Sequence, residues 1–341
     1  MSLSHLQNGG QKMGNRISIL RSALRIAVFG GILLALSGAL FAGPFTFQLG
    51  DIVAGTGTGH YKVFDSSGNF LTTLDTTTGS SEDTGGAFDA SGNLYVTNFT
   101  ANSVSKFDIN GNLLTANFGG PYNSHPESVT IDAAGHIYIG QADGLRHVLE
   151  FDSAGNLLNT FSPATQDRGT DWIDLAPDGK TLYYTSEGNL VKRFDISTNT
   201  QLPDFATLPT EPSYALRLLP NGDVLVANTS EVVLLDTGGN VIKTYTAPGA
   251  DRLFALNILP DGKSFVTGNI DSTGEIFQFN IASGALEQTI FPSPTVDLAG
   301  LIVFGEIGIG PTPNPTVPEP SAIFLLGTVL VGLGAIRRRM A

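Results

Sequence analysis

The chain has 341 residues and no cysteine, so disulfide bonds, thiol catalysis and cysteine-ligated metal sites are excluded. Charged residues make up only 14% of the chain, whereas glycine occurs 41 times. This balance favours many turns and many buried strands. The sequence shows no glycine-rich phosphate loop, no histidine pair with metal-ligand spacing and no Ser/His/Asp constellation, and we therefore predict no catalytic residue.

A unit of four short strand-like runs occupies residues 85–119. Apolar residues cluster in these runs at β-like spacing, and Ser-Gly-Asn and Asn-Gly-Asn turns separate them. Glycine and asparagine tolerate the positive φ that tight hairpins need. The predicted strands are Gly86–Asp89, Asn93–Thr97, Ser103–Asp108 and Asn112–Phe118.

The unit recurs along the chain. The turn between its third and fourth strands starts every 41 to 44 residues, at Asp65, Asp108, Asp152, Asp195, Asp236 and Asn280. A glycine that precedes the second strand recurs every 40 to 44 residues. A period of about 40–50 residues with four strands per repeat is typical of β-propeller blades.

The strand count predicts an all-β fold, a six-bladed β-propeller over residues 45–305. Residues 51–74 supply three strands, and Val296–Phe304 reads as one further inner strand. We expect this last strand to complete the N-terminal blade and so to close the ring. The five complete units begin at Gly85, Glu127, Asp171, Tyr214 and Leu253.

The unit resembles the NHL repeat. Phe88–Val96 and Lys106–Asn112 fit its pattern of a strand ending in Asp, a Gly-Asn turn and a Tyr-Val strand, and Ser128–Ile139 fits it well. The resemblance weakens in the last three blades, where Pro-Asp-Gly or Pro-Asn-Gly replaces the acidic inner turn. It implies a propeller fold but no particular function, because such propellers serve as binders, scaffolds and enzymes.

Residues 1–42 are predicted to be a leader with a signal peptide. Arg16, Arg21 and Arg25 precede the apolar run Ile26–Phe41, and Ala42 offers a small residue for cleavage. The alternative is an uncleaved membrane anchor. The natural start is Met1 or Met13.

The C-terminal end has three parts. After a Gly/Pro-rich spacer at 306–316, Val317, Pro318, Glu319 and Pro320 precede an apolar segment, 321–336, that we expect to be a transmembrane helix. Arg337, Arg338 and Arg339 then act as a membrane stop on the cytoplasmic side.

Residues 317–341 therefore resemble the PEP-CTERM sorting signal. The resemblance implies recognition and cleavage by a membrane transpeptidase called an exosortase, with the helix in the inner membrane only transiently. The alternative is an ordinary C-terminal anchor that stays in place.

Charge sets the expected partners. Without the basic leader and tail, the chain keeps 30 acidic and 11 basic residues, a net charge of −19. Such a domain repels nucleic acid and anionic lipid, so we expect no nucleic-acid partner. It favours divalent cations and neutral or cationic glycans, and we expect an extracellular polysaccharide or a surface protein as partner.

Six acidic residues lie at or just before the predicted inner strands and could form a carboxylate ring around the channel. We regard them as candidate ligands for a cation, Ca²⁺ being the candidate cofactor, with solvated loop acids as the alternative. They are Asp83, Glu127, Asp171, Glu211, Asp251 and Asp297.

Other polar positions have simpler interpretations. The periodic turn aspartates are expected to accept backbone N–H groups, and not to bind metal. We expect His136 to lie at the surface and Trp172 to belong to the core.

Three functional classes stay open. The first is a non-enzymatic surface or matrix protein that uses the propeller as a binding platform, associated with exopolysaccharide or biofilm. The second is a metal-dependent lactonase- or lyase-like propeller enzyme. The third is a sensory ectodomain held on its C-terminal helix. We favour the first.

Overall fold

The computed structural model describes residues 45–210, 212–270, 274–291 and 298–308. The predicted signal peptide, the sorting segment and most of the spacer lie outside these residues. Within the described ranges, no helix is long and apolar enough to cross a membrane.

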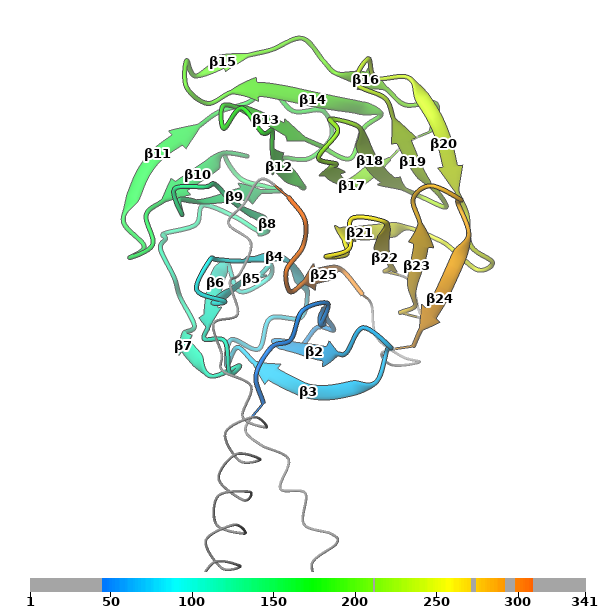
Figure 1. Cartoon of the computed structure of the whole chain (residues 1–341). Helices are drawn as coiled ribbons and strands as arrows, with labels where there is room; N and C mark the ends of the chain where they lie inside the picture. Colours follow the sequence, from blue (N-terminus) through cyan, green and yellow to red (C-terminus); the bar gives the residue numbers. More distant parts are fainter. Residues whose placement is uncertain (1–44, 211, 271–273, 292–297, 309–341) are drawn as a thin grey trace, which may run out of the picture. The chain divides into compact units, whose positions relative to one another are not determined.

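Six antiparallel sheets surround a central channel, as the view in Figure 1 shows. From channel to rim, the first blade consists of β25 (Gly300–Val303), β1 (Ile52–Gly55), β2 (His60–Phe64) and β3 (Phe70–Asp75). The second consists of β4 (Asp83–Phe88), β5 (Leu94–Asn98), β6 (Ser103–Phe107) and β7 (Leu113–Thr115). The third consists of β8 (Pro126–Ile131), β9 (Ile137–Gln141), β10 (Val148–Phe151) and β11 (Leu157–Phe161). The six-bladed prediction is confirmed.

The other three blades follow in order around the ring. The fourth consists of β12 (Ile173–Leu175), β13 (Thr181–Tyr184), β14 (Leu190–Asp195) and β15 (Thr200–Gln201), with β16 (Ala206–Thr207) also on β14. The fifth consists of β17 (Ser213–Leu218), β18 (Val224–Asn228), β19 (Val232–Leu235) and β20 (Val241–Tyr245). The sixth consists of β21 (Leu253–Ile258), β22 (Ser264–Asn269), β23 (Ile276–Asn280) and β24 (Leu286–Ile290). In the fourth blade, Pro203 lies between β15 and β16, where its missing N–H interrupts the outer edge.

The first blade joins the two ends of the propeller. β25 pairs antiparallel with β1, in a register that sets Ile52 opposite Val303 and Gly55 opposite Gly300. This confirms the predicted closure, although the strand begins only at Gly300, and residues 296–297 lie outside the described ranges. Every residue from Leu301 to Phe304 is 2% exposed or less.

The turn aspartates cap their own turns, as predicted. In the second blade, Asp108 Oδ1 accepts the N–H groups of Asn110 and Asn112, both at 2.9 Å, and Oδ2 accepts Asn112 Nδ2 at 2.9 Å. Gly111 takes a φ of 74° in this turn. The same hydrogen bonds recur at Asp65, Asp152 and Asp236.

Neighbouring blades meet closely where a second strand passes the start of the next inner strand. Thr97 Oγ1 donates to the Glu127 carbonyl at 3.0 Å, and Thr185 Oγ1 donates to the Tyr214 carbonyl. At the equivalent place in the third blade stands Gly140, where a Cβ would collide with the Thr170 carbonyl oxygen. Threonine or glycine at these positions fixes where each inner strand begins.

The two faces of the ring differ. Inner strands begin on one face, here called the loop face, which also carries the connections between second and third strands. They end on the other, here called the turn face, which carries the aspartate turns. Both ends of the described chain lie on the turn face, because Phe47 N–H donates to the Ile109 carbonyl and Gly50 N–H donates to the Phe304 carbonyl.

Truncation tests the closure. Removal of residues 296–341 deletes β25 and several fully buried apolar side chains, among them Leu301 to Phe304. Each is worth about 1.5–3 kcal/mol, so the total loss, on the order of 10 kcal/mol, is comparable to the whole stability of a typical domain. We expect this variant to lose its cooperative thermal transition. Removal of residues 309–341 alone is the matched control and should leave the melting temperature unchanged. Equal melting of the two variants would refute closure by β25.

Candidate binding site at the channel mouth

Three of the six predicted acids lie on consecutive blades at the loop face. Asp83 opens β4, Glu127 lies in β8 and Asp171 precedes β12, and their exposed fractions are 1%, 0% and 1%. Asp251 is exposed. Glu211 and Asp297 lie outside the described residues, so the six-membered ring stays a prediction.

The side chains of Glu127 and Asp171 are buried without a hydrogen-bond partner among the described residues. None of their four carboxyl oxygens accepts a hydrogen bond from a described residue. Burial raises the pKa of both groups well above the usual range, and the charge of Glu127 raises that of Asp171 further. Burial thus favours the protonated form of both carboxyl groups.

Asp83 is better satisfied. Its Oδ2 accepts the N–H groups of Gly59 and His60 at 3.0 and 3.1 Å, whereas Oδ1 has no hydrogen-bond partner within the described ranges. Burial outweighs these hydrogen bonds and raises the pKa of Asp83 to about 7.

A second layer, here called the mouth cluster, consists of Phe99, His125, Asp143, Arg168 and Glu187. Arg168 forms ion pairs with Asp143 and, at 3.5 Å, with Glu187, and its guanidinium lies 5.3 Å from the centre of the Phe99 ring. His125 Nδ1 is 2.7 Å from Asp143 Oδ2, and its ring stacks on Phe99 at 4.3 Å.

Electrostatics couple the mouth cluster to the buried pair. Arg168 is the cation that opposes the raised pKa of Glu127 and of Asp171, and Glu187 and Asp143 act in the other direction. Burial disfavours the charge of Arg168, but Glu127 and its other acidic neighbours raise its pKa. Although burial alone would raise the pKa of Asp143, hydrogen bonds from Arg168 and His125 lower it.

Solvent reaches the mouth cluster but not the buried pair. The side chains of Arg168 and Asp143 are 30% and 34% exposed, and those of His125 and Glu187 are 33% and 21% exposed. The sequence pattern did not predict the residues of the mouth cluster, because they lie in loops outside the repeat pattern. That pattern marks the turns of the turn face. The signal available was the acidic stretch around a single arginine, residues 167–171.

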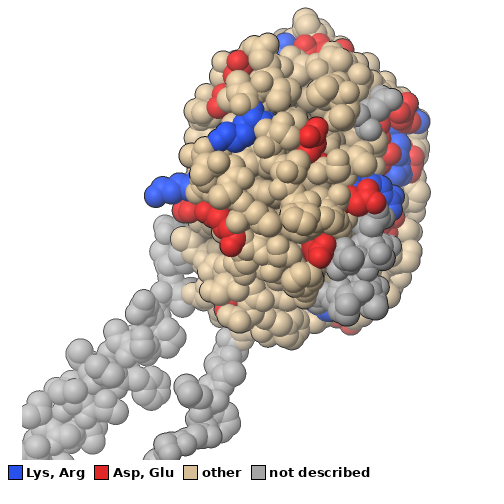
Figure 2. Space-filling view, turned by 90° about the vertical axis from the view of Figure 1, so that its right-hand side faces the viewer, with Lys and Arg blue, Asp and Glu red and all other residues tan. Residues whose placement is uncertain are grey.

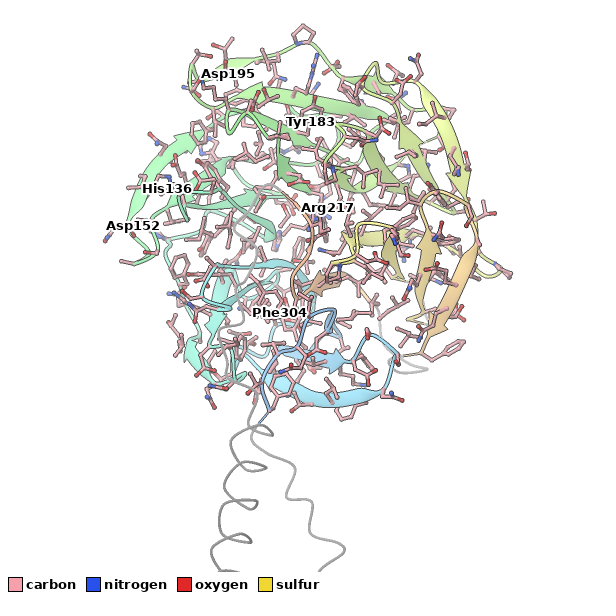
Figure 3. All side chains as sticks on the ribbon, in the orientation of Figure 1. His136, Asp152, Tyr183, Asp195, Arg217 and Phe304 are labelled. Carbon is pink, nitrogen blue, oxygen red and sulfur yellow. The ribbon has the colours of Figure 1, made fainter. Side chains whose placement is uncertain are left out.

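Trp172, the only tryptophan of the chain, lies below the acids and fills the channel. It is 1% exposed and packs with residues of the fifth, sixth and first blades. The Arg217 guanidinium lies 5.4 Å from the centre of the Trp172 side-chain ring. Figure 3 shows Arg217 near the middle of the propeller. The core assignment of Trp172 is confirmed.

His136 lies near the surface, with Nδ1 3.1 Å from Glu150 Oε1 and a side chain 39% exposed, also as expected.

The turn face has a separate small pocket of about 60 Å³ at the other end of the channel. Asp174, Arg217 and Glu306 contribute its charged lining. Glu306 accepts hydrogen bonds from Arg217 Nε at 2.9 Å, Asn257 Nδ2 at 2.8 Å and the Ile258 N–H at 2.7 Å. These bonds fasten the outgoing chain to the fifth and sixth blades.

The geometry gives no direct support to a metal centre. Among the described residues, no group of three or more His, Asp or Glu side chains is placed to hold a metal ion. The calcium hypothesis stays a prediction, since two of its six residues are not described.

Solved structures resemble this fold at low sequence identity. A nidogen/laminin complex matches with a TM-score of 0.60 and 14% identity over 74% of this chain and 97% of that one. A protein of unknown function from Bacteroides caccae matches with a TM-score of 0.60 and 14% identity over 75% and 98%. The WD40 β-propeller domain of Doa1 matches with a TM-score of 0.56 and 13% identity over 74% and 81%.

One curated protein also shows similarity. It is U3 small nucleolar RNA-associated protein 12 of Saccharomyces cerevisiae, 29% identical over 139 residues. The match covers 39% of this chain and 14% of that protein.

Fold and repeat together define a six-bladed β-propeller with NHL-like repeats. Residues 316–339 match the PEP-CTERM protein-sorting motif. The protein is thus a propeller that carries a PEP-CTERM sorting signal, which implies export, anchoring in the membrane before processing, and processing by an exosortase-type enzyme.

The buried pair sets a pH dependence of stability. A carboxyl group whose folded pKa lies above its unfolded pKa stabilises the fold fully below about pH 4, and this stabilisation is lost as pH rises through the folded pKa. The double variant Glu127→Gln, Asp171→Asn has neither carboxyl group and does not lose stability in this way as the pH rises. We expect urea unfolding to show it more stable than the parent at pH 8 by at least about 1.4 kcal/mol, the equivalent of one pKa unit, with a smaller difference at pH 4.5. A gain that does not grow with pH would contradict the raised pKa values.

Proposed function

We propose that this protein is a non-enzymatic binding protein of the cell surface or extracellular matrix, delivered by its sorting signal and associated with exopolysaccharide. The match of residues 316–339 to the sorting motif carries the proposal. The propeller serves as the platform that is displayed.

The burial of Glu127 and Asp171 favours binding over catalysis. A general acid or base must come within about 2.6–3.2 Å of the proton it transfers. Glu127 and Asp171 are 0% and 1% exposed, so a substrate outside the mouth cluster does not reach them. The metal-dependent lactonase- or lyase-like enzyme is the second candidate, and the elevated carboxyl pKa values at a channel mouth are the observation in its favour.

The surface charge is compatible with this role. The side seen in Figure 2 carries small separate groups of both signs on a mostly uncharged surface. A surface of this kind has no extended basic patch on the side shown, which agrees with the expectation that nucleic acid is not the partner.

Processing is the test. In a host with an exosortase, the parent should appear outside the inner membrane as a shorter product that lacks the residues after about Pro320. Glu319→Ala should keep the protein full-length and membrane-bound, because Glu319 lies in the Pro318-Glu319-Pro320 part of the sorting motif. Asp251→Ala, at an exposed position outside the motif, is the matched control and should be processed as the parent is. Intact chain with Arg337–Arg339 at the native cell surface would show that the tail is a plain anchor.

A further inference from the structure

The turn-face pocket lies where the inner strands of five blades end. Phe88 comes from β4 of the second blade, Thr130 from β8 of the third, Asp174 from β12 of the fourth and Arg217 from β17 of the fifth. Val303 comes from β25 of the first blade. The pocket therefore exists only in the closed ring, at the end of the channel.

Solvent reaches this pocket. A segment here called the strap, residues 305–308, completes its lining, and within the strap Glu306 and Ile307 are half-buried and Gly308 is exposed. Ala87, which also lines the pocket, is half-buried. The volume of about 60 Å³ is about four to six times what one water molecule requires, so the end of a larger molecule can enter.

Arg217 keeps hydrogen-bond donors for a ligand. Its Nε donates to Glu306 Oε1 at 2.9 Å and its Nη1 donates to the Leu216 carbonyl at 3.0 Å. These bonds use two of the five N–H groups of a guanidinium, so three are left. The guanidinium is held in place by Glu306 and by the ring of Trp172, whose centre lies 5.4 Å away.

The two carboxylates of the pocket keep acceptor sites. Asp174 accepts the N–H groups of Leu175 and Leu218, both at 2.9 Å, and Thr130 Oγ1 at 3.4 Å. Glu306 likewise accepts the three hydrogen bonds described above. Since a carboxylate has about four acceptor sites, each group keeps about one.

Open donors and open acceptors thus share one small space. A hydroxyl group both donates and accepts, so two neighbouring hydroxyls can bond to Arg217 and Asp174 at once. An anion would meet two carboxylates and one guanidinium, and a cation would leave the open N–H groups of Arg217 unmatched. The apolar part of the lining, which includes Phe88 and Ile302, suits the C–H groups between hydroxyls.

We propose that the turn-face pocket binds the terminal unit of a neutral glycan through two neighbouring hydroxyl groups. The assignment rests on the binding role proposed above and names the class of ligand. Arg217 donates to the hydroxyl oxygens, Asp174 and Glu306 accept from the hydroxyl groups, and the rest of the glycan stays outside. A neutral ligand also avoids repulsion by a domain with a net charge of −19.

Ligand-observed saturation-transfer NMR on the full-length chain, in a detergent without a sugar head group, tests the proposal. The neutral probes are the methyl glycosides of glucose, galactose and mannose, which differ in the arrangement of their hydroxyls. We expect at least one to bind with a Kd of about 1 mM or tighter. Its per-O-methylated counterpart, which has no hydroxyl donor, should not bind. Methyl glucuronide should bind at least about tenfold more weakly, because its carboxylate meets two others.

Variants assign the binding to this pocket. Ala87→Leu fills the pocket without removing a hydrogen bond and should weaken binding more than about tenfold. Thr130→Val removes one hydroxyl and should weaken it about two- to tenfold, the range of one neutral hydrogen bond. Ala90→Leu, three positions after Ala87 and exposed, is the matched control and should leave the affinity unchanged. A thermal melt of each variant checks that it is folded.

Four results would overturn the assignment: absence of binding by all three neutral glycosides, equal binding of the O-methylated sugar, equal or tighter binding of the glucuronide, or unchanged affinity in both folded pocket variants. Processing at Pro318–Pro320 is measured separately. A correctly processed protein that fails these titrations would refute the glycan site while leaving the surface role intact.

Discussion

The pairing of β25 with β1 is the interaction on which the rest of the structure depends. A blade contributes only four short strands and cannot bury both of its faces alone, so each blade relies on its neighbours. Closure supplies the missing neighbour at both ends of the chain and gives β1 a pairing partner on its inner side. In a chain without cysteine, no covalent link could replace it.

Closure also determines how the molecule is displayed. Because β25 runs along the channel and ends at the turn face, the last described residues of the propeller lie beside the first ones. Phe47, Phe88 and Phe304 pack against one another at this point, with ring centres 4.8 to 5.8 Å apart, and Figure 3 shows Phe304 inside the ring. The acids at the other mouth are thereby placed away from both ends of the described chain.

Much of the fold could be predicted from the sequence because residues of the turns mark the repeat. Asp108 and Gly111 have local roles, hydrogen-bond acceptance and a positive φ, that do not depend on distant contacts. The start of β25 was predicted too early, since the apolar pattern continues from Val296 although pairing with β1 begins at Gly300. The split outer edge at Pro203 was not anticipated.

The site was predictable only in part. Asp83, Glu127 and Asp171 could be found because the period places them at inner strands. Arg168 could not be found in this way, because its contacts with Asp143 and Glu187 join loops of two blades, and loop length and direction are set by tertiary packing.

Trp172 allows the most direct test of the central claim that closure makes the ring one cooperative unit. It is the only tryptophan, and it reports on the channel, where several blades meet, whereas far-ultraviolet circular dichroism reports on all strands. The measurement is one equilibrium urea titration followed by both signals. A closed ring predicts a single transition with coincident midpoints. Separate midpoints, with the tryptophan signal changing while most strands persist, would contradict it.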